Sequence, residues 1–276
     1  MAIIMDGKYL RDKILAQLKN RLGGAVPTLA VILVGDNNEA SQIYVRNKEK
    51  FAAAAGINSR VIRMAYETST QELLSEIYKL NNDESITAML VQLPLPKHID
   101  EAAVINAISP DKDADGFTPI NIGKLVLGWH GIAPATPRGI IALLDEYKIN
   151  IDSMNAVVIG RSNIVGKPIA QMLTARNATV TLCHSHTKNL QDITKNADII
   201  VCATGRPVLH GNMVKQGATV IDVGIFHDEN GKLRGDVDFE SVSEFAGYIT
   251  PVPGGIGPMT IAGLMMNTVD LFFQKH

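Results

Sequence analysis

The stretch from Ala156 to Pro168 constrains the fold most, because an apolar strand pattern changes there into a glycine turn and then into a helix. The run Val157–Ile159 is too short for a buried helix, and Gly160 directly after it lets the backbone approach a ligand closely. From Gly166 the chain resembles a first helical turn with a proline placed early. We expect the free N–H groups and the positive dipole end of this helix to suit a pyrophosphate.

The match of this turn to the dinucleotide fingerprint G-x-G-x-x-G is imperfect. Ser162 stands at the second glycine position and Val165 at the third, and the next glycine, Gly166, comes one residue late. On this pattern alone, a tight strand-to-helix turn with no ligand fits equally well. Further strands are expected at residues 179–183, 199–203 and 218–223, at the spacing of strand-helix-strand units, so a dinucleotide-binding domain is the better interpretation.

Length and charge restrict the class of protein. The chain has 276 residues, 46% of them hydrophobic, which suits two domains. Its net charge of -2, from 26 basic and 28 acidic residues, does not indicate the positive charge that binding to nucleic acid or an anionic membrane requires, so we expect small-molecule partners. No apolar stretch approaches the roughly 20 residues of a membrane span and no signal peptide is evident, so we expect a cytoplasmic protein. Cys183 and Cys202 are expected to be reduced core thiols, and no metal is expected.

The remaining pattern predicts an α/β fold with two domains. In the first 110 residues helices alternate with apolar strands, which favours a mainly parallel sheet; the segments are a helix at 7–22, a strand at 28–34, a helix at 39–55, and strands at 59–65 and 86–92. A capping box at Ser69-Thr70-Gln71-Glu72 begins the helix between the last two strands. We expect residues 1–137 and a returning C-terminal helix, 258–276, to form a catalytic domain, and 138–257 a Rossmann-type domain.

Three groups of polar residues in the first domain are candidates for chemistry. Tyr44 and Lys48 stand four apart and share one helix face, although a solvated charged face explains this spacing at least as well. Gln92 comes at the carboxyl end of a buried strand, where open parallel sheets bind ligands. Asp113 and Asp115 lie in a loop with Asp111; for this acidic loop we favour turn formation over a divalent metal site.

Taken together, six motifs resemble the bifunctional methylenetetrahydrofolate dehydrogenase/cyclohydrolase family in order and spacing. They are Tyr44-x-x-x-Lys48, Gln92-Leu-Pro-Leu-Pro96, Lys112-Asp-Ala-Asp-Gly116, Pro134-Ala-Thr-Pro-Arg-Gly139, Gly160-Arg-Ser-x-Ile-Val-Gly166 and Pro253-Gly-Gly-Ile-Gly-Pro-Met-Thr260. The resemblance covers nearly the whole chain. It implies oxidation of 5,10-methylenetetrahydrofolate with a nicotinamide cofactor, hydrolysis of the methenyl product to 10-formyltetrahydrofolate, and a homodimer.

The resemblance also implies roles for individual residues. Lys48 is the candidate for proton transfer, Gln92 would hold it, Tyr44 would line the folate ring and Asp115 would accept hydrogen bonds from the pterin. The substrate wall near the folate and nicotinamide would come from Pro253, Gly254, Gly255 and Thr260. The cofactor residues would be Gly160, Arg161, Ser162, Ile164, Val165, Gly166, Ser185, Thr204 and Ile225.

The strand ending at Cys183 predicts NADP over NAD. NAD-selective folds place an acid about 20 residues past the glycine turn, but residues 182–188 contain none. Arg161, Ser185 and Lys188 are placed to meet a 2′-phosphate instead, although Arg161 packing only over the adenine is an alternative. Two further alternatives stay open: another two-domain NADP-dependent dehydrogenase, such as a shikimate-type or amino-acid dehydrogenase, and a catalytically idle NADP-binding regulatory module.

Overall fold

The computed structural model describes the backbone of residues 1–35 and 39–275, and all side chains of these except those of 39–45. Two compact units are present: Lys13–Ala135 with Ile261–His276, and Met1–Asp12 with Thr136–Thr260. The chain passes from one unit to the other at Ala135 and Thr136, close to the expected junction at Pro137. The first twelve residues, expected in the catalytic domain, lie instead in the unit that carries the dinucleotide turn.

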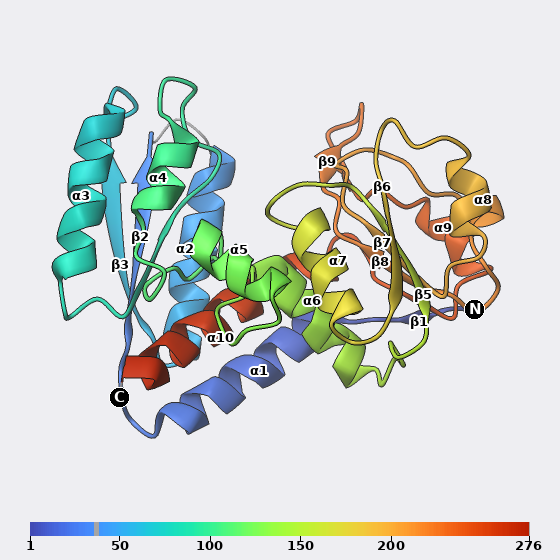
Figure 1. Ribbon diagram of the computed structural model, residues 1–276, viewed down its shortest axis with the longest axis horizontal. Helices are drawn as coiled ribbons and strands as arrows, with labels where there is room; N and C mark the ends of the chain where they lie inside the picture. Colours follow the sequence, from blue (N-terminus) through green and yellow to red (C-terminus); the bar gives the residue numbers. More distant parts are fainter. Residues whose placement is uncertain (36–38, 276) are drawn as a thin grey trace. The chain divides into compact units, whose positions relative to one another are not determined.

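The first unit is built on a three-stranded parallel sheet of order β3-β2-β4. Its elements are the greater part of α1 (Gly7–Leu22), then β2 (Thr28–Val34), α2 (Glu39–Ala54), β3 (Asn58–Met64), α3 (Thr70–Asn82), β4 (Ala88–Val91), α4 (Glu101–Ala107), α5 (Pro119–Val126) and most of α10 (Ile256–Lys275). The helices α3 and α4 cover one face of the sheet with a shared apolar core, and α2 lies on the other side (Figure 1).

Local sequence signals account for much of this unit. The capping box is present, because Ser69 Oγ accepts from the backbone N–H of Glu72 and the Glu72 carboxylate accepts from that of Ser69. Strand β2 is buried from Leu29 to Val34, which matches its continuous apolar run. Helix α5 was not expected, since its segment is rich in glycine, proline, aspartate and asparagine.

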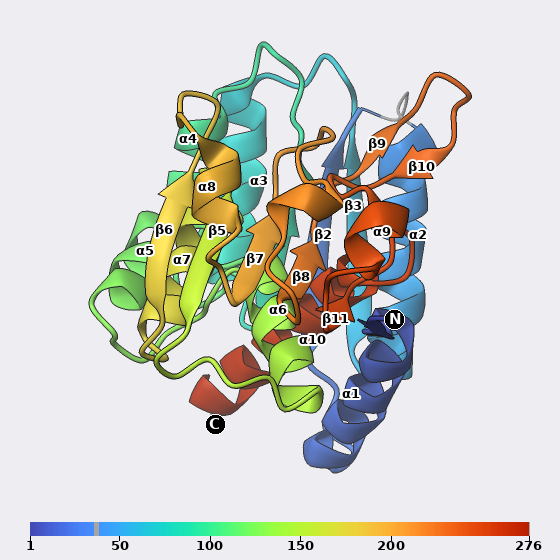
Figure 2. The ribbon, with the colours of Figure 1, turned by 90° about the vertical axis from the view of Figure 1, so that its right-hand side faces the viewer.

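The second unit is built on a six-stranded parallel sheet of order β1-β11-β8-β7-β5-β6. Its elements are β1 (Ile3–Ile4), α6 (Ala135–Glu146), β5 (Asn155–Ile159), α7 (Gly166–Thr174), β6 (Thr179–Cys183), α8 (Leu190–Thr194), β7 (Ile199–Cys202), η1 (Gly211–Met213), β8 (Thr219–Asp222), β9 (Phe226–His227), β10 (Leu233–Arg234), α9 (Phe239–Ser243) and β11 (Tyr248–Ile249). Figure 2 shows β6, β5, β7 and β8 side by side in this order. The parallel pairing of β1 with β11 is what places the N-terminus in this unit.

The C-terminal helix α10 corrects one expectation. It has 20 residues and is long and apolar enough to cross a membrane by length and composition, although no such stretch was expected. However, the greater part of its apolar stretch is buried inside the protein, as in the core helix of a soluble protein. Arg21 of α1 forms an ion pair of 2.6 Å with Asp270 of α10, and Gly263 packs directly against the backbone of Ala135. The return of this helix to the first unit is therefore confirmed.

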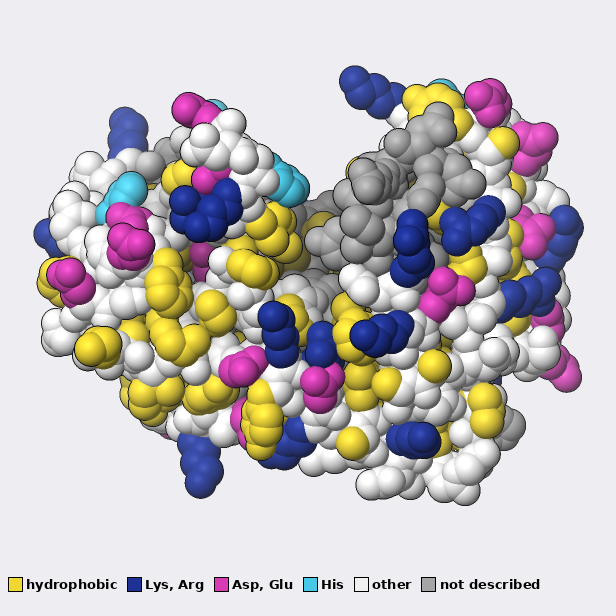
Figure 3. Space-filling model, turned by 180° about the vertical axis from the view of Figure 1, so that it is seen from behind, with side chains coloured by type: hydrophobic (Ala, Val, Ile, Leu, Met, Phe, Trp, Pro, Cys, Tyr) yellow, Lys and Arg dark blue, Asp and Glu magenta, His cyan; other side chains and the backbone are white. Residues whose placement is uncertain are grey.

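The two cysteines end the two strands that flank β5. Cys183 ends β6 and Cys202 ends β7, and both are buried free thiols, as expected. On the face drawn in Figure 3, basic side chains are interspersed with acidic ones, without an extended patch of a single sign. This mixed surface agrees with the nearly balanced charge of the sequence.

Candidate active site

Lys48 and Gln92 meet at the carboxyl edge of the three-stranded sheet. The Lys48 Nζ donates a hydrogen bond of 2.8 Å to Gln92 Oε1, and Gln92 Nε2 donates to the carbonyl of Leu93 at 2.6 Å. The backbone N–H of Gln92 donates to Ile32 O at 2.8 Å, which ties the residue to the central strand β2. Both ends of the Gln92 amide are therefore fixed, and the amide orients the ammonium group of α2. The side chain of Tyr44, on the same helix, lies outside the described residues.

The loop that carries Asp115 runs along the free edge of β4. Met89 N–H donates to Lys112 O at 2.7 Å and Ala114 N–H donates to Met89 O at 3.0 Å, so the loop continues the sheet for one bridge. Gly116 follows with a φ of +73°, and a Cβ there would collide with the backbone of Ala133. The position of Asp115 is therefore set by backbone pairing on one side and by a close backbone crossing on the other.

The three acids of this loop have different environments. Asp113 is buried and its carboxylate accepts from Gly116 N–H at 2.9 Å, Thr118 N–H at 2.8 Å and Asn121 Nδ2 at 3.0 Å, so it is a structural turn residue. Asp111 is exposed. Among the described residues, no group of three or more His, Cys, Asp or Glu side chains could hold a metal ion.

Two buried polar residues to which the sequence analysis gave no role hold the surroundings of this loop. Lys112 Nζ donates to the carbonyls of Leu80 and Asp83, both at 2.7 Å, at the end of α3. Asn267, fully buried on α10, donates through Nδ2 to Ala114 O at 2.7 Å and to Ala133 O at 2.9 Å. The second residue joins the C-terminal helix to the segment that ends at Asp115.

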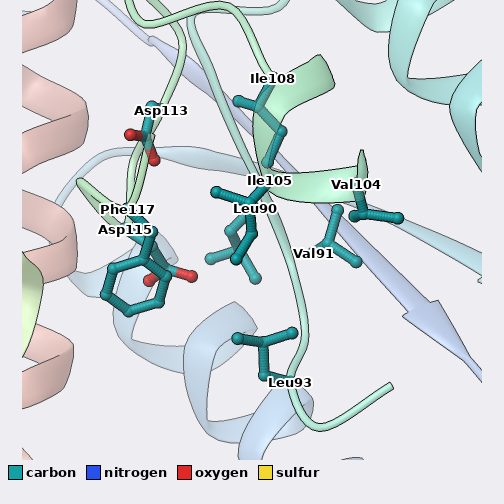
Figure 4. A pocket seen from close by; sticks show the side chains of 9 residues that line it. All are labelled: Leu90, Val91, Leu93, Val104, Ile105, Ile108, Asp113, Asp115 and Phe117. Carbon is teal, nitrogen blue, oxygen red and sulfur yellow. The ribbon is translucent and has the colours of Figure 1, made fainter. Parts of the chain in front are cut away.

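An apolar pocket explains the electrostatics of the site. It is lined by two acids and seven apolar residues, Leu90, Val91, Leu93, Val104, Ile105, Ile108, Asp113, Asp115 and Phe117 (Figure 4). Burial raises the pKa of Asp115 to about 6, the positive charge of Lys48 opposes this shift, and the neighbouring Asp113 adds to it. Burial also lowers the pKa of Lys48, against the opposing effect of Asp115. An amine with a lowered pKa can accept a proton closer to neutral pH, as a general base must.

In the second unit, the strand order reverses at β5, which has β6 on one side and β7 on the other. Such a reversal is where doubly wound sheets bind dinucleotides. Gly160 follows β5 with a φ of +119°, and a Cβ there would collide with the carbonyl of Ala203. A Cβ on Gly166 would collide with the carbonyl of Gly160. The two glycines therefore allow the backbone after β7 and the start of α7 to pack directly against the turn, which is the close helix–strand packing that dinucleotide-binding turns need.

Ser162 corrects the expectation that the first N–H groups of α7 are free. Its Oγ accepts from Val165 N–H at 3.2 Å and from Gly166 N–H at 3.3 Å, and its carbonyl accepts from Lys167 N–H at 3.0 Å. The hydroxyl thus satisfies helix donors that would otherwise meet an anion. This use of the serine explains how the turn dispenses with the second glycine of the fingerprint.

The residues expected at the cofactor follow the carboxyl ends of neighbouring strands. Ile159 is paired with Cys183, so the exposed side chains of Arg161 and Ser185 follow adjacent strand ends. Ile164 is 41% and Ile225 42% exposed, which offers apolar surface to a ring. Lys188 is also exposed. Thr204 is already engaged: its N–H and hydroxyl both donate to Asp236 Oδ2, at 2.5 and 2.9 Å.

The segment from Pro253 to Thr260 is held tightly within the second unit. Gly254 has a φ of +114°, and a Cβ on Gly7 would collide with the carbonyl of Gly255. The hydroxyl of Thr260 shares a 2.8 Å hydrogen bond with that of Thr136 and lies 3.3 Å from the carbonyl of Ile256. These contacts fix the backbone of the segment.

Comparison with known proteins gives matches along both units. A family model of the tetrahydrofolate dehydrogenase/cyclohydrolase catalytic domain matches residues 5–115, and a model of the NAD(P)-binding domain of the same enzymes matches residues 134–276. The bifunctional protein FolD of Streptococcus sanguinis is 56% identical over 279 residues, which cover 99% of this chain and 98% of that protein.

Solved structures agree. The bifunctional FolD methylenetetrahydrofolate dehydrogenase/cyclohydrolase of Campylobacter jejuni has a TM-score of 0.97 and 47% identity, with 100% of both chains covered. The FolD enzyme of Trypanosoma brucei, complexed with NADP cofactor and inhibitor, has a TM-score of 0.93 and 37% identity over 99% of this chain and 98% of that one.

Proposed function

Because the chain belongs to the tetrahydrofolate dehydrogenase/cyclohydrolase family, we propose that it oxidises 5,10-methylenetetrahydrofolate with NADP and hydrolyses the methenyl product to 10-formyltetrahydrofolate. The observation that carries the proposal beyond family membership is the pair formed by Lys48 and Gln92 with Asp115 as the charged neighbour of Lys48. This arrangement supplies an amine whose pKa is lowered by burial, which suits the proton transfer that hydrolysis needs.

The first reaction removes a hydride from the carbon that bridges N5 and N10 of the folate. The nitrogen lone pairs stabilise the cation that forms, so the step requires positioning more than a protein acid or base. NADP supplies the hydride acceptor when bound. On this chain Gly160, Gly166 and Arg161 would hold its phosphates, and Ile164 and Ile225 would offer apolar surface to its rings.

The second reaction needs a proton acceptor. Water attacks the methenyl carbon and loses one proton to a base; as the bond from that carbon to N5 then breaks, the remaining hydroxyl gives up its proton, N5 takes up a proton, and the formyl group stays on N10. Lys48 in its neutral form takes the proton from water, and its lowered pKa makes that form available near neutrality. Gln92 fixes the direction of the amine through Oε1. Tyr44 lines the folate ring in the same proposal.

Asp115 serves the folate by accepting hydrogen bonds from the pterin amine and ring N–H. Its side chain fits this role because no hydrogen bond to its carboxylate occurs among the described residues, whereas the carboxylate of Asp113 is saturated. Pro253, Gly254, Gly255 and Thr260 form a wall near the folate and nicotinamide. Their closely packed backbone supports this role.

The choice of NADP rests on the end of β6. No acid follows Cys183 within the turn, while Arg161, Ser185 and Lys188 are exposed there and carry donors for a 2′-phosphate. The relative from Trypanosoma brucei has NADP bound. As parts of the same proposal, the protein is a cytoplasmic homodimer. Family membership argues against a shikimate-type or amino-acid dehydrogenase, and the presence of Lys48 argues against an idle regulatory module.

The experiment is to mix the purified protein with methylenetetrahydrofolate and either NADP or NAD, and to follow the absorbance of methenyltetrahydrofolate. We expect a higher kcat/KM with NADP, followed by decay of the methenyl signal as hydrolysis proceeds. Absence of methenyl product with both cofactors would refute the dehydrogenase. A preference for NAD would refute only the assignment of the 2′-phosphate site.

A further inference from the structure

Two buried aspartates at the carboxyl end of β8 belong to neither chemical step. Asp222 is the last residue of β8 and is 4% exposed, and Asp236 is fully buried. Asp222 Oδ1 accepts from Gly224 N–H at 3.1 Å and from Asp236 N–H at 2.9 Å, and its Oδ2 accepts from Val237 N–H at 3.0 Å. All of its partners are neutral backbone donors.

Asp236 has a different pattern of contacts. Its Oδ2 accepts three hydrogen bonds, from Thr204 N–H, from Thr204 Oγ1 and from Gly205 N–H at 3.3 Å. Its Oδ1 is buried without any hydrogen-bond partner and lies against Gly224, where a Cβ would collide with it. In the described part of the chain, no Lys, Arg or His side chain forms an ion pair with either aspartate.

The hydrogen bonds of Asp236 require an acceptor but not a charge. Asparagine in the same orientation would present its Oδ1 to the same three donors and place its amide nitrogen where the unpartnered oxygen lies. A buried carboxylate without a cation is costly, because its desolvation is not compensated. The negative charge at this position therefore points to a positive charge that the chain itself does not supply.

The location of the pair identifies that charge. The 2′-phosphate end of the cofactor belongs with β6 in the proposed function, and a dinucleotide extends across the strand reversal toward β7 and β8. The pair lies under this second side, bonded to Thr204 after β7 and packed on Gly224, which precedes Ile225. The nicotinamide ring belongs on this side, and that ring is positively charged when oxidised and neutral when reduced.

We propose that the Asp222 and Asp236 carboxylates make the protein bind the oxidised cofactor, whose nicotinamide ring is positively charged, more tightly than the reduced cofactor, whose ring is neutral. The inference rests on the proposed function, because it takes the cofactor as given. The two aspartates act on the ring by their charge, and they position the backbone at Thr204 and Gly224. By favouring the oxidised form, they oppose the loss of positive charge from the ring during hydride transfer.

The charge of the pair depends on pH, which allows an independent test of the proposal. Burial raises the pKa of Asp222 to about 7, its hydrogen bonds from Asp236, Val237 and Gly224 N–H oppose the shift, and the charge of Asp236 adds to it. Cys202 at the end of β7 also lies beside the pair; burial, Asp222 and Asp236 raise its pKa well above the ordinary thiol value. Cys202 therefore stays neutral while the charge of the pair grows as the pH rises through about 7.

The test measures dissociation constants for NADP⁺ and NADPH separately, by titration of wild type, Asp236→Asn and the control Thr204→Val at pH 7.5. At an effective dielectric constant of about 20, two unit charges separated by about 10 Å interact with an energy that corresponds to a change on the order of tenfold in affinity. We expect Asp236→Asn to weaken NADP⁺ by about that factor while NADPH changes less than about twofold. Thr204→Val removes the hydroxyl that bonds to Asp236 Oδ2 and to Arg206 O but removes no charge, and should affect both forms by the same factor.

A preference between the two forms that is unchanged in a folded Asp236→Asn protein would overturn the inference. Wild type provides a second measurement that needs no variant: the ratio of the two affinities should shift toward NADP⁺ between pH 6 and pH 8. The 2′-phosphate is common to both forms, so its own titration cancels in the ratio. A ratio that stays flat over this range counts against the pair. Failure of both forms to bind would instead refute the proposed cofactor.

Discussion

Asn267→Leu probes whether α10 positions the Asp115 loop. Asn267 is fully buried, and its amide donates to Ala114 O and Ala133 O at 2.7 and 2.9 Å. Leucine has a similar volume but cannot donate, so the buried carbonyl of Ala114 and the partly buried carbonyl of Ala133 lose a partner. An unsatisfied buried group costs about 1 to 3 kcal/mol, so we expect the free energy of unfolding to fall by about 2 to 4 kcal/mol. Ala114 precedes Asp115, so folate binding should also weaken.

Urea denaturation gives the stability change, and the folate KM gives the effect on the site. The matched control is Thr268→Val on the same helix, which removes only the bond from Thr268 Oγ1 to Leu264 O at 2.9 Å. We expect the control to lose about 1 kcal/mol or less, with an unchanged KM. If Asn267→Leu loses no more stability than the control, or if its folate KM is that of wild type, the reasoning about α10 is wrong.

Three further predictions concern the candidate site. Asp115→Asn should weaken folate binding, since a charge-assisted acceptor is typically worth about 1.5 to 3 kcal/mol, while NADP affinity measured by titration stays nearly intact; activity that disappears with EDTA and returns with magnesium would overturn this role. The pKa of Asp115 is raised to about 6, so kcat/KM for the folate should fall as the pH drops through about 6. The contribution of Asp115 to stability has the opposite pH dependence. It should decrease as the pH rises from about 4 to 6, because the folded state binds the proton more tightly than the unfolded state does. Arg161→Ala should raise the KM for NADP more than the KM for NAD, and an equal effect on both cofactors would show that the arginine only packs over the adenine.

The sequence predicted the elements whose signals are local. The apolar run and glycine of the turn after Ile159, the capping box at Ser69 and the continuous strand β2 depend on neighbouring residues, and all of them occur. Gln92 was placed correctly at the end of its strand because chain order determines which end of a parallel strand faces the site. Its bond to Lys48 connects residues 44 positions apart, and only the family resemblance pointed to it.

Interactions across long sequence distances could not be predicted in the same way. Asn267 is one amide in a mainly apolar helix, and its acceptors lie 153 and 134 residues away. In the sequence Lys112 resembles a charged loop residue, but its ammonium group donates hydrogen bonds to two backbone carbonyls of another segment. β1 has only two residues, too few for a periodic signal, so its pairing with β11 was not visible.

Ser162 shows a different limit. A serine at a glycine position of the fingerprint weakens the pattern match, but it does not reveal that the hydroxyl will accept from two N–H groups of the following helix. The N–H groups at the start of α7 were expected to be free, because the first N–H groups of a helix generally have no partner within the helix. The capping preference of serine was the signal that could have corrected this assumption.

The measurement that tests the central claim most directly is the rate of both reactions in Lys48→Met, a side chain of similar length that cannot titrate. If Lys48 takes the proton from water, methenyl hydrolysis should fall about 10² to 10⁴-fold, as general base catalysis predicts, with a clearly smaller loss of dehydrogenase activity. Methenyltetrahydrofolate should then accumulate in the reaction mixture. Equal losses in both reactions would mean that Lys48 chiefly binds folate, and an unchanged hydrolysis rate would contradict its role as the base.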